Sequence, residues 1–357
     1  IAKAERTNLA HLRNEEQFLG FYLKCLRDAV FVDISDFEIR ERRATLAPLL
    51  ITFKKVIWKL LKFYTYRLWS QQNQVNGLLV AKVRARAIRV GVVANRVRKN
   101  TKVLFFESPT NPTLKIADIP ALAEIAKSND LSLVVDNTFT PMVVSPLQLG
   151  ADVVVYSMTK YINGASDLIA GAICARRSFI RQLMDLHTGR AMLLGPTMDP
   201  RAAFDIIQRV PHLAVRMREH GRRAMAIAEH LQTWGLTVTY PGLPAFPQHA
   251  QMRAMMNPGY GWGGMLTIDC GTQKKAEAVM DRLQNTERFG FMAVSLGYFD
   301  TLMSCSGSST SSEIDENEQR AMGLAPGLVR LSVGLTGNLE ERLNQLQRAL
   351  QACGLIG

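Results

Sequence analysis

Three polar stretches in the middle of the chain each follow an apolar run, and their residue types suit amine chemistry. The stretches are ESPTNP (107–112), DNTFTP (136–141) and SMTK (157–160). The side chains with chemical potential are Lys160, Asp136, Asn111, Ser157 and Thr159. A lysine held in a partly desolvated crevice has a lowered pKa and forms Schiff bases with aldehydes. The set therefore indicates a site built around a reactive amine.

An aspartate beside such a lysine has a specific use. A carboxylate at an adjacent strand end is suited to hold the protonated ring nitrogen of pyridoxal 5′-phosphate (PLP), which makes the ring an electron sink for a substrate carbanion. Hydroxyls that flank the lysine are suited to donate to the cofactor phosphate. Taken singly, Asp136 is equally explained as a turn former at a strand end and Lys160 as a surface lysine. The combination is what favours a PLP site.

The apolar runs predict the elements that position these residues. Strands are expected at TKVLFFE (101–107), LSLVVD (131–136), ADVVVYS (151–157) and AGAICAR (170–176), with a helix at 116–129. Strands separated by a helix and rich in Val, Leu and Phe predict an α/β fold with a mostly parallel sheet buried between helix layers. Ligands of such sheets bind beyond the carboxyl ends of the strands, which is where the polar stretches lie.

From about residue 211 the pattern changes to that of a smaller α+β unit. A helix is expected at 213–232, strands at 236–240, 263–269, 291–297 and 328–334, and a closing helix from Leu339 to Ala352. The expected domains are therefore a large-domain core at 101–210 and a small C-terminal domain at 211–357.

Residues 1–100 have different statistics. They hold 20 Lys and Arg and 8 Asp and Glu, so the whole net charge of +12 lies here and the remainder is neutral. The basic apolar stretch 49–69 and the basic stretch 82–99 have two readings: contact with an anionic membrane surface or nucleic acid, or ordinary solvated and packed helix faces. The second reading is favoured, so neither a nucleic acid nor a membrane is expected as partner.

Cysteine, histidine and hydropathy patterns exclude other classes. The five cysteines are scattered without a CxxC pair and the six histidines form no ligand pattern, so neither a disulfide framework nor a metal site is expected. No run approaches the roughly 20 apolar residues of a membrane span, and the first residues lack the apolar core of a secretion signal. A cytoplasmic location is expected.

Four stretches carry a family resemblance. They are FFESPTNPTLKIADIPALAEIAK (105–127), LVVDNTFTPMVVSPLQLGADVVVYSMTKYINGASDLIAGAIC (133–174), FGFMAVSLGYFDTLMSCSGSSTSSE (289–313) and APGLVRLSVGLTGNLEERLNQLQRAL (325–350). Together they resemble the PLP-dependent cystathionine and methionine metabolism family, and most closely its methionine gamma-lyase-like members. The resemblance covers about 101–350.

The resemblance implies an aspartate-aminotransferase-like (type I) PLP fold and a role for each site residue. It implies Lys160 as the Schiff-base lysine, Asp136 as the partner of the ring nitrogen and Asn111 as a neighbour of the ring's phenolic oxygen. It implies that Ser157 and Thr159 bind the phosphate. Arg330 of LVRLSVG would bind the substrate α-carboxylate, with Ser295 of VSLG beside it. It also places the loop at 305–313 near the site and implies a homo-oligomer, a dimer or tetramer.

The reaction implied by the resemblance is the α,γ-elimination of L-methionine to methanethiol, 2-oxobutanoate and ammonia. The alternatives are γ-replacement or β-elimination on homoserine esters, cystathionine or cysteine. A third alternative is an inactive PLP-fold remnant, because three family motifs are absent from residues 1–100: a Tyr-x-Arg segment, a Ser-Gly-Met turn and a Tyr-Gly-Gly-Thr. This N-terminal segment is therefore either a genuine replacement or the product of a frameshift or mis-splicing.

Overall fold

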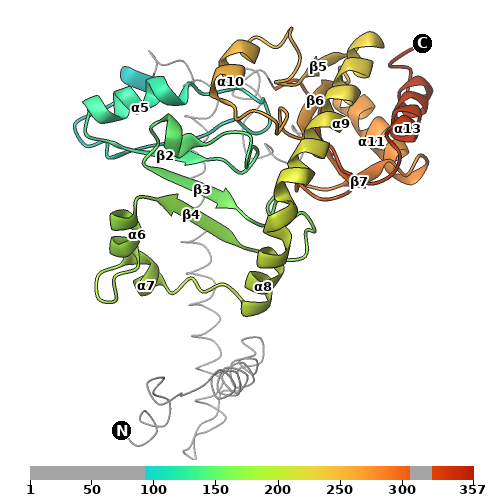
Figure 1. Ribbon diagram of the computed structural model, residues 1–357. Coiled ribbons are helices and arrows are strands. Elements are labelled where there is room, and N and C mark those ends of the chain that lie inside the picture. The colour runs from blue at the N-terminus through green and yellow to red at the C-terminus, as the bar shows by residue number, and fades with distance from the viewer. Residues whose placement is uncertain (1–92, 306–323) are drawn as a thin grey trace, which may run out of the picture. The chain divides into compact units, whose positions relative to one another are not determined.

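The computed structural model describes residues 93–305 and 324–357 (Figure 1). The first sheet of this part has four strands in the order β1-β2-β3-β4. They are β1 (Val103–Glu107), β2 (Ser132–Asp136), β3 (Val153–Ser157) and β4 (Gly171–Ala175). The first three are parallel and β4 runs antiparallel to β3. The predicted strands and the mostly parallel sheet are confirmed.

Helix α5 (Ile119–Ser128) connects β1 to β2 and begins where the sequence supplies a cap. The Asp118 side chain accepts a hydrogen bond from Ala121 N at 3.0 Å, and Pro120 occupies the first turn, where its missing N–H costs nothing. The helix buries Ile119, Leu122 and Ala126. This apolar stripe fixes α5 against the sheet, as Figure 1 shows beside β2.

Short helices follow β3 and β4. They are η2 (Pro146–Leu149) before β3, and then α6 (Arg177–Leu183), α7 (Arg190–Leu194), α8 (Pro200–Arg209) and η3 (Val210–His212) after β4. Helices α6 and α7 bury none of their residues. Helix α8 is capped by Asp199 and buries Ala202 and Ile206.

The second sheet has five strands in the order β5-β6-β9-β8-β7. They are β5 (Thr237–Thr239), β6 (Met265–Asp269), β9 (Leu328–Ser332), β8 (Thr301–Cys305) and β7 (Gly290–Met292). The accompanying helices are α10 (His249–Met255), α11 (Gln273–Asn285) and α13 (Leu339–Ala352). Apolar side chains of α11, α13 and the last turns of α9 form one core with this sheet.

Helix α9 (Leu213–Thr233) contacts both sheets' surroundings (Figure 1). Its first turns place Leu213 and Met217 in the core of the first sheet. Its later turns place Ile227 and Leu231 in the core of the second sheet. One continuous helix therefore ties the two cores together.

Two predictions about the second part need correction. The predicted strand 291–297 is wrong in its second half, because β7 ends at Met292 and the VSLG residues form a loop. Strand β8 was not predicted. The predicted closing helix Leu339–Ala352 is confirmed, with Asn338 as its N-cap. Across the described ranges no helix is long and apolar enough to cross a membrane.

Candidate active site

The carboxyl ends of β1, β2 and β3 lie side by side. Glu107 is in register with Asp136, and Asp136 with Val155. A pocket of about 190 Å³ opens at these ends. It is lined by Glu107, Pro109, Asn111, Asp136, Thr138, Phe139, Ser157, Lys160, Val294, Leu296 and Arg330. The structure thus brings together five predicted site residues: Asn111, Asp136, Ser157, Lys160 and Arg330.

Lys160 follows β3 in a turn in which its own N–H donates to Ser157 O at 3.2 Å. Its side chain crosses to the loop after β7, where Nζ donates to Ser295 Oγ at 2.8 Å. Burial lowers the pKa of the Lys160 amine, and the positive charge of Arg330 lowers it further. A lower pKa increases the neutral fraction of the amine near neutral pH, and the neutral form is the one that acts as nucleophile or base.

Asp136 ends β2 and its carboxylate caps the turn that follows. Oδ1 accepts a hydrogen bond from Thr138 N at 2.9 Å. Thr138 Oγ1 in turn accepts from Ser157 N at 2.8 Å, so this hydroxyl joins the ends of β2 and β3. These contacts hold the carboxylate at the pocket without neutralising it.

Arg330 comes from the second sheet and is 2% exposed. Its Nη1 donates to Asn111 Oδ1 at 2.9 Å and its Nη2 donates to Ser295 O at 2.9 Å. Its Nε is buried without a hydrogen-bond partner within the described residues. Burial lowers the pKa of this guanidinium. A buried cation with one unpaired donor is a costly arrangement unless an anion completes it.

Two predicted residues stand apart from the pocket lining. Ser295 reaches the site through its hydrogen bonds with Lys160 and Arg330. The Thr159 hydroxyl is engaged with the backbone of Ala170, donating to its carbonyl at 3.3 Å and accepting from its N–H at 3.0 Å. Thr159 therefore ties the lysine turn to the start of β4, and its predicted phosphate contact stays a prediction.

Sequence reasoning missed several lining residues. Glu107 ends β1 as Asp136 ends β2, and its Oε2 accepts a hydrogen bond from Asn111 N at 3.2 Å. Its place at a strand end was a usable signal. Thr138 and Phe139 follow Asp136 directly, whereas Val294 and Leu296 flank Ser295 in the motif VSLG.

Several expectations lie outside the described residues. The three motifs expected in the family and absent from 1–100 would lie mostly before residue 93, as would the basic stretch 49–69. The loop at 305–313 falls almost wholly in 306–323. Where the structure is described, no three His, Cys, Asp or Glu side chains come together as a metal site would require.

The donors of the pocket fit PLP. An amine with a lowered pKa, a carboxylate held by a backbone N–H, and a buried arginine with an unpaired Nε line one cavity. They suit, respectively, an aldehyde, a pyridine nitrogen and the carboxylate of an amino acid. The fit concerns the ring and the substrate, while phosphate contacts are represented by Ser157 in the lining.

Comparison with known proteins identifies the class. Residues 61–351 match the family of Cys/Met metabolism PLP-dependent enzymes, and the chain belongs to this family. The type I PLP fold is confirmed by similarity to the crystal structure of cystathionine gamma-lyase from Lactobacillus plantarum complexed with L-serine. That likeness has a TM-score of 0.66 and 28% identity, and covers 74% of this chain and 68% of the other.

The relatives have more specific names. The chain is 54% identical over 260 residues to methionine gamma-lyase of Arabidopsis thaliana, covering 72% of this chain and 59% of that protein. It is 37% identical over 263 residues to L-methionine gamma-lyase of Fusobacterium nucleatum subsp. polymorphum, covering 72% and 64% respectively. The matched region thus spans about six tenths of the length of these relatives.

Proposed function

We propose that this chain binds PLP at Lys160 and catalyses α,γ-elimination of L-methionine to methanethiol, 2-oxobutanoate and ammonia. The observation that carries the proposal is the meeting of Lys160, Asp136 and Arg330 in one pocket. The identity of 54% to a protein named methionine gamma-lyase supports the choice of substrate.

Each residue has a task in this proposal. When bound, PLP supplies an electron sink next to the α-carbon of the substrate. Lys160 would hold the cofactor and then move the α-proton on its Nζ, for which the lowered pKa of the amine is suited. Asp136 would hold the ring nitrogen in its protonated form. Asn111 would lie at the ring's phenolic oxygen, with Ser157 and Thr159 at the phosphate.

Arg330 and Ser295 would orient the substrate. Arg330 is already fixed by Asn111 Oδ1 and Ser295 O, so it loses little conformational freedom when it binds a carboxylate. Ser295 Oγ holds Lys160 Nζ at 2.8 Å, which keeps the amine on the side of the pocket nearest Arg330's other partner. The α-carbon would thereby be presented to the base.

A second candidate is γ-replacement or β-elimination on homoserine esters, cystathionine or cysteine. It is favoured by relatives named cystathionine beta-lyase of Coxiella burnetii, at 35% identity, and cystathionine gamma-lyase of Bacillus subtilis, at 33%. Incubation with methionine, and separately with O-acetylhomoserine plus sulfide, separates the candidates. Methanethiol from methionine supports elimination, whereas homocysteine formation without methanethiol supports replacement.

Assembly and location follow from the same proposal. Exposed apolar side chains, including Ile169 at 90% and Leu194 at 82%, support a homo-oligomer, a dimer or tetramer, because patches of this kind mark association surfaces. We place the protein in the cytoplasm, with a small sulfur amino acid as substrate.

The test is the visible absorbance of the full chain after addition of PLP and dialysis, compared with Lys160→Ala. A retained band that is lost in Lys160→Ala supports the proposal, and methionine turnover should fall by at least about 10³-fold in the same variant. Lys127→Ala, at an exposed lysine of α5, is the matched control and should keep both. Absence of a band in the unmodified chain would support the inactive remnant instead.

A further inference from the structure

The backbone directly after Lys160 is held by an arginine of α9. Arg216 Nη1 donates to Tyr161 O, and Arg216 Nη2 donates to Ile162 O at 2.8 Å. Its Nε donates to His212 Nδ1 at 2.9 Å, and Nη2 also reaches Arg209 O at 3.2 Å. The guanidinium thus joins the lysine segment to the start of the long helix.

This arginine is partly buried among neutral acceptors. Its acceptors are three carbonyl oxygens and one imidazole nitrogen, and no carboxylate is among them. Burial, followed by the charge of Arg209, lowers the pKa of Arg216 to about 10. Withdrawing a cation from water without a counter-charge is unfavourable, so packing alone gives little reason for an arginine here, whereas a fork of donors suits two successive carbonyls.

Two glycines make this arrangement possible. Gly164 has φ +80°, and a Cβ at this position would lie 2.6 Å from Arg216 Nη1. Gly297 has φ +74°, and a Cβ there would lie 2.4 Å from Tyr161 N. Gly297 N also donates to Ser332 Oγ at 2.8 Å. The loop that carries Ser295 therefore lies against the amide of Tyr161, and the arginine holds the carbonyl of the same residue.

We propose that Arg216 is a positioning residue for Lys160. By holding the carbonyls of Tyr161 and Ile162, it fixes the backbone from which the Lys160 side chain reaches Ser295 Oγ. The inference rests on the proposed function for the task of Lys160, but the position of the lysine can be measured independently of any reaction. Loss of the arginine should let the segment relax and the amine become more hydrated.

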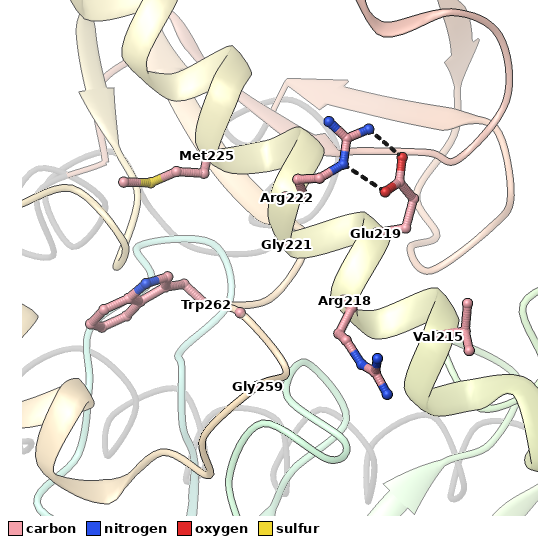
Figure 2. A pocket seen from close by; sticks show the side chains of 9 residues that line it. Val215, Arg218, Glu219, Gly221, Arg222, Met225, Gly259 and Trp262 are labelled. Atoms are coloured by element: carbon pink, nitrogen blue, oxygen red, sulfur yellow. Dashed lines mark hydrogen bonds and ion pairs between the residues drawn. The ribbon is translucent and has the colours of Figure 1, made fainter.

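The variants are Arg216→Met, Arg216→Lys and Gly164→Ala. Methionine keeps the aliphatic body and removes all donors, lysine offers a cation without the fork, and alanine at 164 displaces Nη1 while keeping the arginine. Arg218→Met is the matched control on the same helix. Figure 2 shows Arg218 on α9 at a separate pocket of about 720 Å³, which Met225 and Trp262 also line.

A second control separates positioning from general loss of stability. Leu231→Ala removes a fully buried side chain near the far end of α9, in the core of the second sheet. This variant should destabilise the protein without altering the lysine segment. It shows what a weakened fold alone does to each readout.

The first readout is the pH dependence of Lys160 acetylation by acetic anhydride in the full chain before PLP is added, measured by peptide mass spectrometry. The midpoint should rise by about half a pH unit or more in Arg216→Met and in Gly164→Ala, because hydration restores the ordinary pKa of an amine. Arg216→Lys should give a smaller rise. Arg218→Met and Leu231→Ala should match the unmodified chain.

The second readout is turnover of methionine with PLP bound. Arg216→Met should lower kcat about 10- to 100-fold, since a small misplacement of a reacting group has effects of this size, while KM changes less than about threefold. An unshifted acetylation midpoint in Arg216→Met, or an equal shift in Leu231→Ala, overturns the inference. An unmodified chain without turnover removes the proposed function, and the acetylation midpoint still decides on Arg216.

Discussion

The two sheets differ in how well their own helices cover them. Every residue of β8 and β9 is buried. No residue of β4 is buried, and Ile173 in its centre is 48% exposed. Strand β4 is also an edge of the first sheet in the described residues. The second sheet is thus a closed core, whereas the first sheet is open one strand away from the site lysine.

This difference teaches where stability and association reside. The helices after β4 add to the open region rather than cover it, because Leu186 and Leu194 are 69% and 82% exposed. Contiguous apolar surface of this kind marks an interaction surface. The closed core supplies Arg330 to the site, and the open sheet supplies Lys160. The site therefore depends on one self-sufficient part and one part that association would complete.

Thiol reactivity gives the largest expected contrast between the two regions. Cys174 of β4 is exposed, whereas Cys270 and Cys305 are each 2% exposed. Burial raises the pKa of the Cys270 thiol to about 12, so its thiolate fraction at pH 8 is about 10⁻⁴. Iodoacetamide should therefore modify Cys174 at least about 10³-fold faster than Cys270.

The measurement is peptide mass spectrometry of the folded chain over time, with the same reaction in guanidinium chloride as reference, where all thiols should react alike. Protection of Cys174 in the folded chain would contradict an open β4 edge. Dilution would then show whether a second copy provides the cover, because protection by association weakens at low concentration.

Paired truncations should show the same contrast in stability. Leu331→Ala empties a fully buried position of β9 and should lower the free energy of unfolding by about 2–5 kcal/mol. Ile173→Ala in β4 should change it by no more than about 0.5 kcal/mol. Urea unfolding of both variants measures this. A loss of more than about 2 kcal/mol for Ile173→Ala would mean that β4 is covered in solution.

The sequence was sufficient for the elements that carry the first half of the site. Strands β1, β2 and β3 are apolar runs that end at Glu107, Asp136 and Ser157, where polar residues begin. Since parallel neighbours end at one edge, the meeting of these residues follows from the pattern alone. Division of the chain at 100 and 210 stays a prediction.

The rest depended on tertiary contacts that no local pattern encodes. The VSLG motif reads as a strand, but Gly297 adopts φ +74° and the Ser295 carbonyl is used by Arg330. Strand β8 was missed because TLMSC is short and adjoins a serine-rich stretch. Arg216 reads as one more charge on an amphipathic helix, and only the fold places it 54 residues away on Ile162 O.

His220 offers a test of the joint between the closed and open regions. It is fully buried on α9, its Nδ1 donates to Val333 O at 2.6 Å, and its ring meets Tyr161 edge-on with centroids 5.0 Å apart. Val333 follows β9 and Tyr161 follows β3, so this side chain contacts both regions. Its Nε2 is buried without a hydrogen-bond partner among the described residues.

The pKa of His220 is lowered to about 4, mainly by burial and then by the charges of Arg216 and Arg223, while the Val333 carbonyl and Glu219 act in the opposite direction. The unfolded chain takes up this proton near its ordinary pKa of about 6.5, whereas the folded protein takes it up only near pH 4. Between these values the unfolded state binds more protons. The free energy of unfolding should therefore rise with pH across this window, by about 3 kcal/mol in total.

Urea unfolding between pH 4 and pH 7 measures this rise, with His220→Gln as the variant and His230→Gln, at an exposed position of the same helix, as the matched control. His220→Gln should flatten the profile in this window, and His230→Gln should keep the full slope. An unchanged slope in His220→Gln would mean that the histidine is already hydrated. The joint between Tyr161 and Val333 would then be as open as β4, and the distinction between a closed and an open region would end at the second sheet.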